Sequence, residues 1–565
     1  MSKLMILDGA MGTMMQDAGM PPGARPDVFG LEHPELLEKI HRQYIEAGSR
    51  VIYTNTFGSN ARKLHGSGHT TQEVVSAAVA TAQRAAEEWN TAHGEDRVRI
   101  ALDVGPTGEM MEPIGVFSFE DAYETYKEMA LAGADAGADL IVFETMSDLY
   151  EVKAAVLAVK ENTDLPVWVT MSFEENGYTF MGTYVGAMAV TLDGLGVDAM
   201  GINCSLGPEA IFPLIKEIKQ WTDKPIIVKP NAGLPNPKTG TYDLDAEEFA
   251  RQMEPYFELG ISMAGGCCGT TPEFISALAA RAAAAPDYGE GETGDEHPLR
   301  HGICSAREIV ELDGNVHVIG ECIHAIGNED LAQSLREGEM DDITDLALDQ
   351  ADEGAEILDI NVGLPDIDEP AIIAEAVRAV QGIVTLPLAI DSADPAAIEA
   401  GLRACNGRAI LNSVNAEEKM LNEILPIAKK YGAAVVGLTM DKNGIPDTAE
   451  QRFALAEKIV MAAEAAGIPR EDVLIDCLTL AAFAQPEQAE ETLRAVRMVR
   501  EQLGAHCVLG VSNISFGLPQ RGQVTAEFLE QALACGLDLP ILNPEQDEVM
   551  DAVEAFRAHS GGDET

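Results

Sequence analysis

The segment Gly265-Gly266-Cys267-Cys268-Gly269-Thr270-Thr271-Pro272 places two adjacent cysteines in a glycine-rich turn. It follows a short apolar run, residues 261–264, and a third cysteine, Cys204, stands just after another such run, residues 199–202. Short apolar runs closed by polar or turn residues are typical of parallel strands buried on both faces. We expect their carboxyl ends, and hence the three thiols, to meet at one face. Three cysteines with a vacant fourth position are a ligand set for an open zinc site.

The same rhythm of apolar runs and amphipathic helical stretches, such as residues 74–89, covers both halves of the chain. Eight strands alternating with helices predict a (β/α)8 barrel. Because the rhythm occurs twice, we predict an α/β fold of two tandem (β/α)8 TIM barrels. The predicted strands are residues 4–7, 51–54, 100–104, 140–143, 167–171, 199–202, 226–228 and 261–264 in the first half, and 316–320, 357–360, 388–390, 409–411, 434–438, 473–475, 507–511 and 540–542 in the second.

A change of composition separates the two halves. Residues 282–298, AAAAPDYGEGETGDEHP, replace the apolar period with Gly, Glu, Asp and Pro, which indicates a linker. We therefore predict a first domain over residues 1–285, an acidic, glycine-rich linker over 286–300 and a second domain over 301–560.

The charge balance excludes several classes of partner. The 565 residues include 38 Lys and Arg against 93 Asp and Glu, a formal charge of −55. Nucleic acids and anionic membranes bind basic surfaces, so neither is expected as a partner. Nine cysteines in so long a chain favour a reducing compartment. Without a signal-like N-terminus or a long apolar segment, we expect a cytoplasmic protein.

Two acids accompany the thiols of the first half. Asp8 follows the first predicted strand and Glu144 the fourth. Carboxylates there are able to hold a substrate ammonium group, although a single acid is more often a cap. A single cysteine is likewise more often a buried apolar residue, but three at two strand ends favour zinc. A zinc-bound thiol is deprotonated near neutral pH, so this half predicts the acceptor site of a methyl transfer.

Seven motifs of the first half resemble the homocysteine S-methyltransferase family. They are LDGAMGTMMQ (7–16), TNTFG (54–58), GPTG (105–108), ETM (144–146), GINCS (201–205), PNAGLP (230–235) and GGCCGTTP (265–272). The resemblance covers essentially all of residues 1–285. It implies Cys204, Cys267 and Cys268 as the zinc ligands at the catalytic centre. It also implies that Asp8 and Glu144 hold the amino group of homocysteine.

A second polar set follows the strands of the second half. A ring of carboxylates and amides at a barrel mouth suits a planar, donor-rich heterocycle such as a pterin. Any one of these residues is more often a turn or cap residue, but together they favour a polar ligand site. The set includes Glu321, Asp359, Asp391, Asn412, Asp476, Asn513 and Arg521.

Residues 315–545 resemble the pterin-binding domain of cobalamin-dependent methionine synthases and their corrinoid methyltransferase relatives. The motifs are GAEILDINVGLPDIDE (354–369), PLAIDSADP (387–395), AILNSVN (409–415) and GVSNISFGLPQR (510–521). The resemblance implies that Asp391, Asn412, Asp476 and Asn513 bind the pterin of the folate, with Asn513 near N5. It places Glu321 and Arg521 nearby.

One loop departs from that family's pattern. Where the family usually reads IGERINPTG, residues 319–327 read IGECIHAIG, so Cys322, His324 and Ile326 replace Arg, Asn and Thr. The loop loses a flexible charge and an amide and gains a titratable ring. Cys322 has no cysteine near it in sequence and is not expected to bind a metal.

Together the halves resemble the two-barrel N-terminal portion of the cobalamin-dependent methionine synthase family. The resemblance implies that a methyl group passes from 5-methyltetrahydrofolate through cobalamin to zinc-bound homocysteine, giving methionine and tetrahydrofolate. The sequence has no corrin-ligand motif Asp-x-His-x-x-Gly, so we expect cobalamin on a separate corrinoid-binding protein or domain.

Two alternatives stay open at this point. In one alternative, the first barrel is a methyltransferase with another donor, such as S-methylmethionine or a betaine, while the second serves a different corrinoid pathway. The other alternative is a zinc-stabilised scaffold whose second half binds its ligand without turnover.

Overall fold

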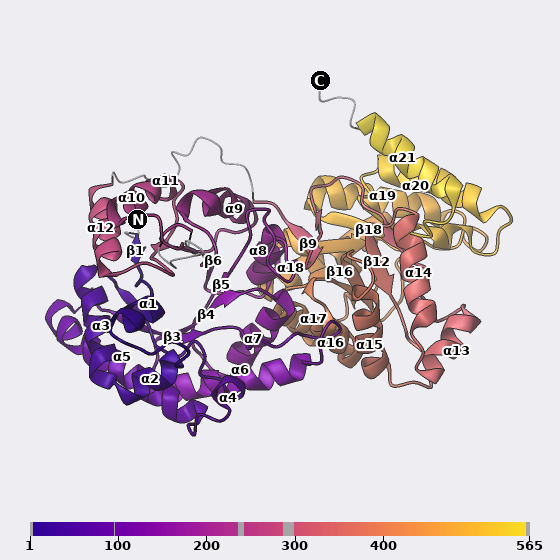
Figure 1. Cartoon of the computed structure of the whole chain (residues 1–565). Coiled ribbons are helices and arrows are strands. Elements are labelled where there is room, and N and C mark those ends of the chain that lie inside the picture. Colours follow the sequence, from indigo (N-terminus) through magenta and orange to yellow (C-terminus); the bar gives the residue numbers. More distant parts are fainter. Residues whose placement is uncertain (1–3, 95, 235–241, 286–298, 561–565) are drawn as a thin grey trace. The chain divides into compact units, whose positions relative to one another are not determined.

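The structure, a computed structural model, describes residues 4–94, 96–234, 242–285 and 299–560. The chain divides into two compact units, Met1–Leu299 and Arg300–Thr565 (Figure 1). Each unit contains eight parallel strands arranged as a barrel, so the prediction of two tandem TIM barrels is confirmed. Of the predicted linker, residues 286–298 lie outside the described residues, and the domain limits 1–285 and 301–560 stay predictions.

The first barrel is closed by one bridge between its first two strands. Seven pairings join the strands in parallel, and a parallel bridge between Leu7 and Val51 links the two edge strands. Every residue of the central strands β5 and β6 is buried, as expected for a sheet covered on both faces. The strands are β1 (Met5–Ile6), β2 (Val51–Tyr53), β3 (Arg99–Val104), β4 (Leu140–Met146), β5 (Val167–Met171), β6 (Ala199–Asn203), β7 (Ile226–Lys229) and β8 (Met263–Ala264).

Helices form the outer layer of the first barrel (Figure 1). The helix predicted over residues 74–89 is longer at both ends. Its earlier start is fixed by Thr70, whose side chain caps the first turn by accepting a hydrogen bond from the Glu73 N–H. The helices are α1 (Met11–Asp17), α2 (Pro26–Glu32), α3 (Pro34–Ala47), α4 (Ala61–Leu64), α5 (Thr71–His93), α6 (Phe119–Ala136), α7 (Leu149–Asn162), α8 (Val185–Gly194), α9 (Pro208–Trp221), α10 (Ala246–Gln252), α11 (Glu254–Glu258) and α12 (Pro272–Ala284).

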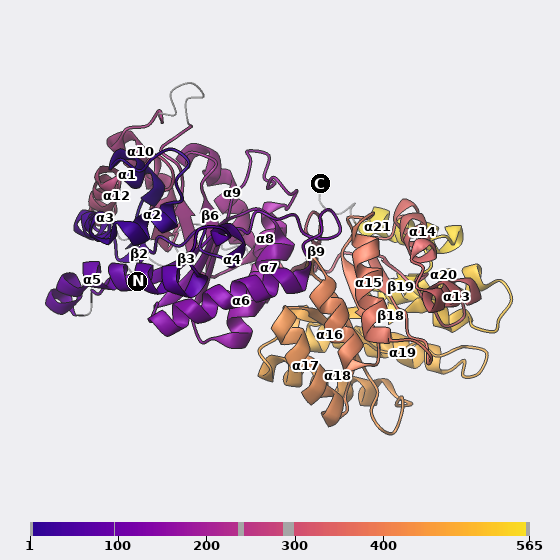
Figure 2. The ribbon, with the colours of Figure 1, turned by 60° about the horizontal axis from the view of Figure 1, so that its bottom comes forward.

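The second barrel closes completely, β19 pairing with β11. Its strands are β11 (Ile319–Gly320), β12 (Ile357–Ile360), β13 (Leu388–Asp391), β15 (Ile410–Asn415), β16 (Ala434–Leu438), β17 (Val473–Asp476), β18 (His506–Gly510) and β19 (Leu539–Leu542). Helices α15 to α18 are visible on its outside in Figure 2. Its α-helices are α13 (Glu329–Glu337), α14 (Asp341–Asp352), α15 (Glu369–Gln381), α16 (Pro395–Ala404), α17 (Glu418–Tyr431), α18 (Ala449–Ala465), α19 (Gln488–Met498), α20 (Arg521–Ala534) and α21 (Asp547–Ser560).

A small antiparallel sheet in the second unit was not predicted. It consists of β9 (Gly302–Ser305), β10 (Ile309–Glu311) and β14 (Gly407–Arg408). Ile303, Val310 and Leu312 belong to the same buried cluster as the first residues of several barrel strands. The hairpin therefore covers the amino-terminal end of the barrel. The predicted first strand, 316–320, is correspondingly shorter, because only residues 319 and 320 pair within the barrel.

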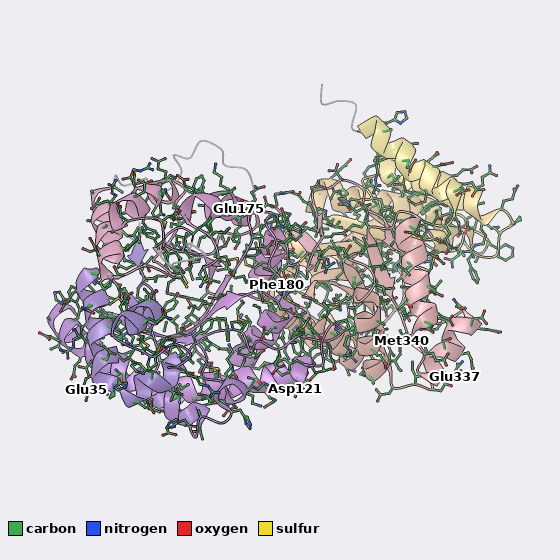
Figure 3. All side chains as sticks on the ribbon, in the orientation of Figure 1. Glu35, Asp121, Glu175, Phe180, Glu337 and Met340 are labelled. Carbon is green, nitrogen blue, oxygen red and sulfur yellow. The ribbon has the colours of Figure 1, made fainter. Side chains whose placement is uncertain are left out.

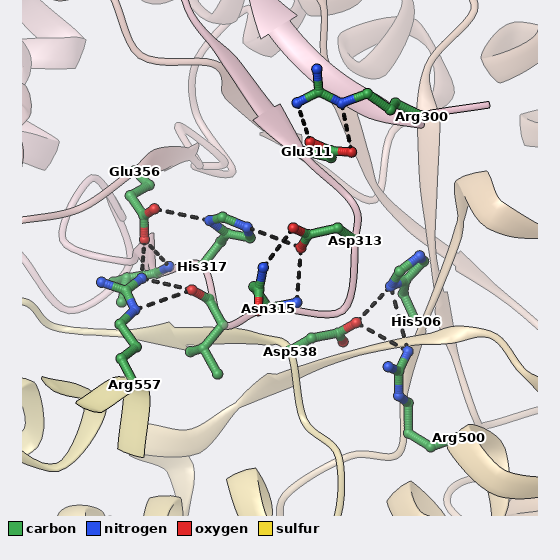
Figure 4. Close-up of polar contacts among 12 residues, drawn as sticks. Arg300, Glu311, Asp313, Asn315, His317, Glu356, Arg500, His506, Asp538 and Arg557 are labelled. Atoms are coloured by element: carbon green, nitrogen blue, oxygen red, sulfur yellow. Dashed lines mark hydrogen bonds and ion pairs between the residues drawn. The ribbon is translucent and has the colours of Figure 1, made fainter. Parts of the chain in front are cut away.

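Ion pairs also tie together the amino-terminal ends of these strands (Figure 4). His317, just before β11, lies 2.9 Å from Glu356, just before β12, and Arg557 of α21 pairs with the same carboxylate. Asp538, just before β19, lies 3.1 Å from Arg500 and also contacts His506. At this end of the barrel each of these acids has a cationic partner, which suits a stabilising role.

The excess of negative charge lies on the surface of both units. Glu35 on α3, Asp121 on α6 and Glu337 on α13 are exposed and project from outer helices (Figure 3). Among the described residues, no helix combines the length and the apolar character that crossing a bilayer requires.

Candidate functional sites

Three cysteine side chains meet at the carboxyl end of the first barrel. Cys204 directly follows β6, and Cys267 and Cys268 lie in the turn after β8. Their Sγ atoms all lie within 4.8 Å of one another, and those of Cys204 and Cys268 are 3.8 Å apart. Thiolates on a tetrahedral zinc ion, each about 2.3 Å from the metal, stand about 3.8 Å from one another. The donor set therefore suits a tetrahedral metal ion with one further ligand.

The backbone around the cysteines adopts conformations that residues other than glycine seldom adopt. Cys204 and Ser205 have φ values of 63° and 55°, in the left-handed region. Gly269, with φ 81°, ends the cysteine turn, and a Cβ at this position would lie 2.3 Å from the Tyr242 ring. Backbone strain of this kind clusters at functional sites, where the surrounding structure holds it in place.

Two residues outside the predicted set contact the thiols. Asn203, fully buried, points its Nδ2 at Cys267 Sγ at 3.8 Å and also donates to Thr145 Oγ1 at 2.8 Å. The Tyr242 hydroxyl donates a hydrogen bond to Cys268. Hydrogen bonds from Cys204 first, and from Cys267 next, lower the pKa of Cys268 to about 3. Against the effect of Cys267, the hydrogen bond with Cys268 and burial raise the pKa of Cys204 to about 11, and hydrogen bonds with both other thiols raise the pKa of Cys267 well above its usual range. The cluster without a metal ion therefore favours one thiolate, on Cys268.

A lysine lies between the two predicted acids. Lys229 Nζ is 3.0 Å from Asp8 Oδ1 and 3.9 Å from Glu144 Oε2, and it stands 3.5 Å from the centroid of the Tyr53 ring. The side chains of Lys229 and Asp8 are each only 3% exposed. Lys229 was not singled out from the sequence. Its position could have indicated it, because it directly follows the apolar run 226–228 and functional groups of such barrels lie at the carboxyl ends of the strands.

Asp8, Asp103 and Glu144 form an acidic wall of this site, and burial is the largest influence on their pKa values. Loss of solvent raises the pKa of Asp8 despite the opposing effect of Lys229 and of the Tyr53 N–H, which donates to Asp8 Oδ2 at 2.7 Å. Burial also raises the pKa of Glu144 and lifts that of Asp103 well above its usual range. For Lys229, burial acts against the charge, but Asp8, Tyr53 and Glu144 outweigh it and raise its pKa.

These groups share a cavity of about 310 Å³ at the barrel mouth. Its walls bring together the residues that the sequence associated with this site, Asp8, Glu144, Cys204, Cys267 and Cys268, and add Tyr53, Asp103 and Lys229. In the part of the chain that the structure describes, the three cysteines are the one group of three or more His, Cys, Asp or Glu side chains close enough to share a metal ion.

The second barrel has a larger cavity, of about 600 Å³, at its own carboxyl end. The cavity is also lined by Asp359, which belongs to the predicted polar set but not to the residues that the resemblance assigned to the pterin, and by His324 of the atypical loop. The structure brings all six residues predicted to bind or flank the pterin to this cavity: Glu321, Asp391, Asn412, Asp476, Asn513 and Arg521.

Amide groups donate hydrogen bonds to three acids of this cavity, Asp359, Asp391 and Asp476. Asn361 Nδ2 donates to Asp391 Oδ2 at 2.9 Å, and Asn412 Nδ2 donates to Asp359 Oδ1 at 3.1 Å. Burial raises the pKa of Asp359 and of Asp391 above their usual range. It raises the pKa of Asp476 to about 6, against the effect of the Leu478 N–H, which donates to this carboxylate at 2.6 Å. Such carboxyls gain most from a ligand that brings its own N–H donors.

The atypical loop after β11 faces the same cavity. Cys322 and His324 line it, while Ile326 is 68% exposed. Burial raises the pKa of Cys322 to about 12, so its thiol stays protonated at neutral pH. His324 Nδ1 lies 3.0 Å from the Ile326 carbonyl oxygen, which holds the ring beside the acids.

Residues 5–282 match the sequence model of the family Homocysteine S-methyltransferase. The first barrel is a homocysteine S-methyltransferase domain. Residues 327–543 match the family Pterin binding enzyme, so the second barrel is a pterin-binding domain. The two family matches occur in the order of the two resemblances along the chain.

Two curated relatives are similar to almost the whole of this chain. The methionine synthase of Mycobacterium leprae (strain TN) is 32% identical over 577 residues, which cover 96% of this chain and 47% of that protein. The methionine synthase of Mycobacterium tuberculosis (strain ATCC 25618 / H37Rv) is 33% identical, with the same shares covered. The chain thus spans about half the length of these relatives.

Among solved structures, the chain is similar to the homocysteine methyltransferase MmuM from Escherichia coli in its oxidized form. The two are 25% identical with a TM-score of 0.44, covering 49% of this chain and 96% of that chain. Dihydropteroate synthase from Xanthomonas albilineans is 20% identical with a TM-score of 0.38, covering 46% of this chain and 98% of that chain.

Proposed function

We propose that this chain carries both substrate sites of a methionine-forming methyl transfer. In this proposal residues 1–285 bind homocysteine on zinc and residues 301–560 bind 5-methyltetrahydrofolate. The methyl group would pass between the two sites through a corrinoid on a separate domain or chain. The observation that carries the proposal is the convergence of the Cys204, Cys267 and Cys268 thiols beside a buried acidic wall, in a homocysteine S-methyltransferase domain.

At the acceptor site the protein supplies a thiolate cage and a polar wall. Cys204, Cys267 and Cys268 hold zinc, which when bound keeps the homocysteine thiol deprotonated and nucleophilic. Asn203 and Tyr242 direct hydrogen bonds at the cysteine sulfurs, and such partners orient metal ligands. The acids of the wall, Asp8 and Glu144 among them, attract the ammonium group of the amino acid.

At the donor site the protein binds the pterin and assists its leaving nitrogen. Asp391 and Asp476 accept N–H groups of the ring, and Asn412 adds an amide between donor and acceptor edges. Asn513, at the exposed side of the cavity, hydrogen bonds at N5, because an amine nitrogen leaves poorly without such help. The corrinoid supplies the nucleophile that removes the methyl group, dividing a hard transfer into two easier ones.

Two half-reactions test the proposal on the zinc-loaded full chain. One is methyl transfer from methylcobalamin to homocysteine, and the other is transfer from 5-methyltetrahydrofolate to cob(I)alamin. Cys267→Ala should lose about one zinc per chain and abolish only the first reaction. Asn513→Ala should slow only the second, by about ten- to a hundredfold, the effect of one hydrogen bond to a charged group. Cys535→Ala, a cysteine outside both cavities, is the control and should retain zinc and both activities.

Other outcomes would contradict separate parts of the proposal. Stoichiometric zinc in Cys267→Ala would exclude the ligand set, and equal damage to both half-reactions by either variant would exclude the division into two sites. Transfer from methylfolate to homocysteine without any added corrinoid would exclude the corrinoid relay. Activity with S-methylmethionine or a betaine, and none with methylcobalamin, would favour another donor.

We also propose a reducing, cytoplasmic setting for this chemistry. All nine cysteines are free thiols in the structure. The proposed zinc ligands must stay reduced to bind the metal, because the thiolate is the ligand.

A further inference from the structure

Arg452, near the start of α18, is fully buried in the second unit and binds three separate segments of the chain. These are the approach to α18, the loop after β17 and the helix α19. Its guanidinium donates to the carbonyl oxygens of Pro446, Cys477 and Leu478 at 3.0, 2.9 and 3.0 Å, to Thr492 Oγ1 at 2.7 Å and to Gln488 Oε1 at 2.6 Å. Burying a charge is costly unless its donors are bonded, and an arginine fork reaches acceptors that the compact ammonium group of a lysine cannot.

Leu478 has a backbone conformation that depends on these contacts. Its φ of 63° lies in the left-handed region, where a Cβ crowds the following carbonyl oxygen. Such a conformation persists only where the surrounding structure holds it. The Leu478 carbonyl oxygen accepts from Arg452 and lies 3.0 Å from the hydroxyl oxygen of Thr492, so it is held from both α18 and α19.

The N–H group of the same leucine points at a carboxylate of the second cavity. Leu478 N–H donates to Asp476 Oδ1 at 2.6 Å, and the backbone N–H of Gly510 also donates to this carboxyl group. Asp476 is 7% exposed and lines the cavity. In the part of the chain that the structure describes, the lining of this cavity includes Asp476 but not Arg452. Any effect of Arg452 on a ligand therefore passes through the loop that follows Asp476.

We propose that Arg452 is a positioning residue of the donor site, which holds Leu478 in its left-handed conformation and thereby fixes the direction of the Asp476 carboxylate. The inference rests on the proposed role of Asp476 in binding the pterin and makes it more specific. A carboxylate that accepts two N–H groups of a planar ring must lie close to the plane of that ring, so its orientation decides how tightly it binds. Without the guanidinium, Leu478 is free to leave the left-handed region, and its N–H then no longer holds Asp476.

A matched pair of variants separates positioning from general stability. Arg452→Lys keeps the charge but loses the fork, and Arg408→Lys makes the same change at another buried arginine of this barrel. Arg408 is 7% exposed and donates to the carbonyl oxygens of Gly432 and Gly302 at 2.6 and 3.1 Å. It precedes β15 and so lies at the opposite end of the barrel. Tetrahydrofolate is titrated calorimetrically into the zinc-loaded full chain, and thermal melting and methyl transfer from methylcobalamin to homocysteine are measured beside it.

Arg452→Lys should weaken tetrahydrofolate binding by about tenfold, the equivalent of one hydrogen bond, and leave the homocysteine half-reaction within about twofold. Arg408→Lys should lower the melting temperature but leave the affinity for tetrahydrofolate within about twofold. Thr492→Val removes the hydroxyl beside the Leu478 carbonyl group. It should weaken binding in the same selective way, by about threefold, and it gives the same comparison if Arg452→Lys fails to fold.

Two further chains test whether Arg452 acts through Leu478 and Asp476. In an Asp476→Asn chain, Arg452→Lys should change the affinity by no more than about twofold, because residues that act through one another are not additive. Leu478→Gly should recover about threefold or more of the affinity lost in Arg452→Lys, because glycine adopts a positive φ without a Cβ penalty.

Normal tetrahydrofolate binding by Arg452→Lys, or an equal loss in Arg408→Lys, would overturn the inference. Additive losses with Asp476→Asn, or no recovery by Leu478→Gly, would overturn it as well. If the unaltered chain failed to bind tetrahydrofolate, the proposed function of the second barrel would fall, and the inference with it. Normal binding by the unaltered chain with an unaffected Arg452→Lys would leave that function standing.

Discussion

The two barrel mouths both gather buried acids, but they neutralise them differently. In the first, Lys229 points into the cavity and pairs with Asp8 at 3.0 Å. In the second, amides contact the acids, while the buried Arg452 lies behind the mouth. Its guanidinium donates to the carbonyl oxygens of Cys477 and Leu478 at 2.9 and 3.0 Å. One buried cation thus compensates a ligand site, and the other holds the loop that follows Asp476.

This difference matches the ligands proposed for the two sites. A zwitterionic amino acid on a metal ion brings one ammonium group, so the first mouth needs only a small excess of negative charge. A pterin is neutral and rich in N–H donors, so the second mouth presents several acids held by amides. At the opposite end of the second barrel, acids such as Glu356 and Asp538 have cationic partners instead (Figure 4).

Removing the cation from the first mouth should have the largest effect on stability. Lys229→Met leaves Asp8 buried without its partner, which for a buried ion pair costs about 3–5 kcal/mol. Scanning calorimetry of the full chain should show the transition of the first unit at lower temperature, in high salt as in low salt. Lys39→Met, on the exposed face of α3, is the control and should change little. An unchanged unfolding temperature in Lys229→Met would contradict the claim that Lys229 compensates the buried charge of Asp8.

Neutralising a buried acid of the second mouth should instead increase the stability of its unit. Burial raises the pKa of Asp476 from 3.8 to about 6, so the folded chain binds this proton more tightly than the unfolded chain. The stabilisation of the folded state by this bound proton is complete below pH 3.8 and is lost as the pH rises through 6. Asp476→Asn should therefore stabilise the second unit by up to about 3 kcal/mol at pH 7, and by roughly half as much at pH 5.

The same Asp476→Asn chain should bind tetrahydrofolate more weakly, because the amide no longer accepts both N–H groups of the ring. Urea unfolding at pH 5 and pH 7 and calorimetric titration measure the two effects. A variant that is less stable at pH 7 would contradict the raised pKa of Asp476. A variant that binds tetrahydrofolate normally would contradict the assignment of this acid to the ligand.

The smallest effect is expected at the exposed rim of the second mouth. Arg521 contacts Ser515 Oγ at 3.2 Å. Burial raises the pKa of Glu321, and Ser512 and Arg521 oppose this rise without cancelling it. Arg521→Gln should weaken tetrahydrofolate binding by about tenfold or less at low ionic strength. Salt screens exposed charges, so the difference should shrink towards 0.5 M salt. A loss that is independent of salt would place Arg521 inside the site, not at its rim.

Much of the fold was predictable because its signals are local. Short apolar runs such as residues 167–171 and 199–202 matched strands β5 and β6 to within one residue, since a strand buried on both faces must be apolar throughout. The β9–β10–β14 sheet was missed because β14 has two residues and pairs with a strand about 100 residues earlier. Pairing at that distance leaves little local pattern.

The sequence by itself determined which chemical groups reach each barrel mouth. Parallel strands deliver their carboxyl ends to one face, so cysteines and acids that follow apolar runs must gather there. Only the tertiary structure decided how those groups divide their roles. The Asp8–Lys229 pair joins residues 221 positions apart, and Arg452 contacts Leu478, 26 positions further along the chain. Charge state and hydrogen-bond partners depend on burial and distance, which the order of residues does not specify.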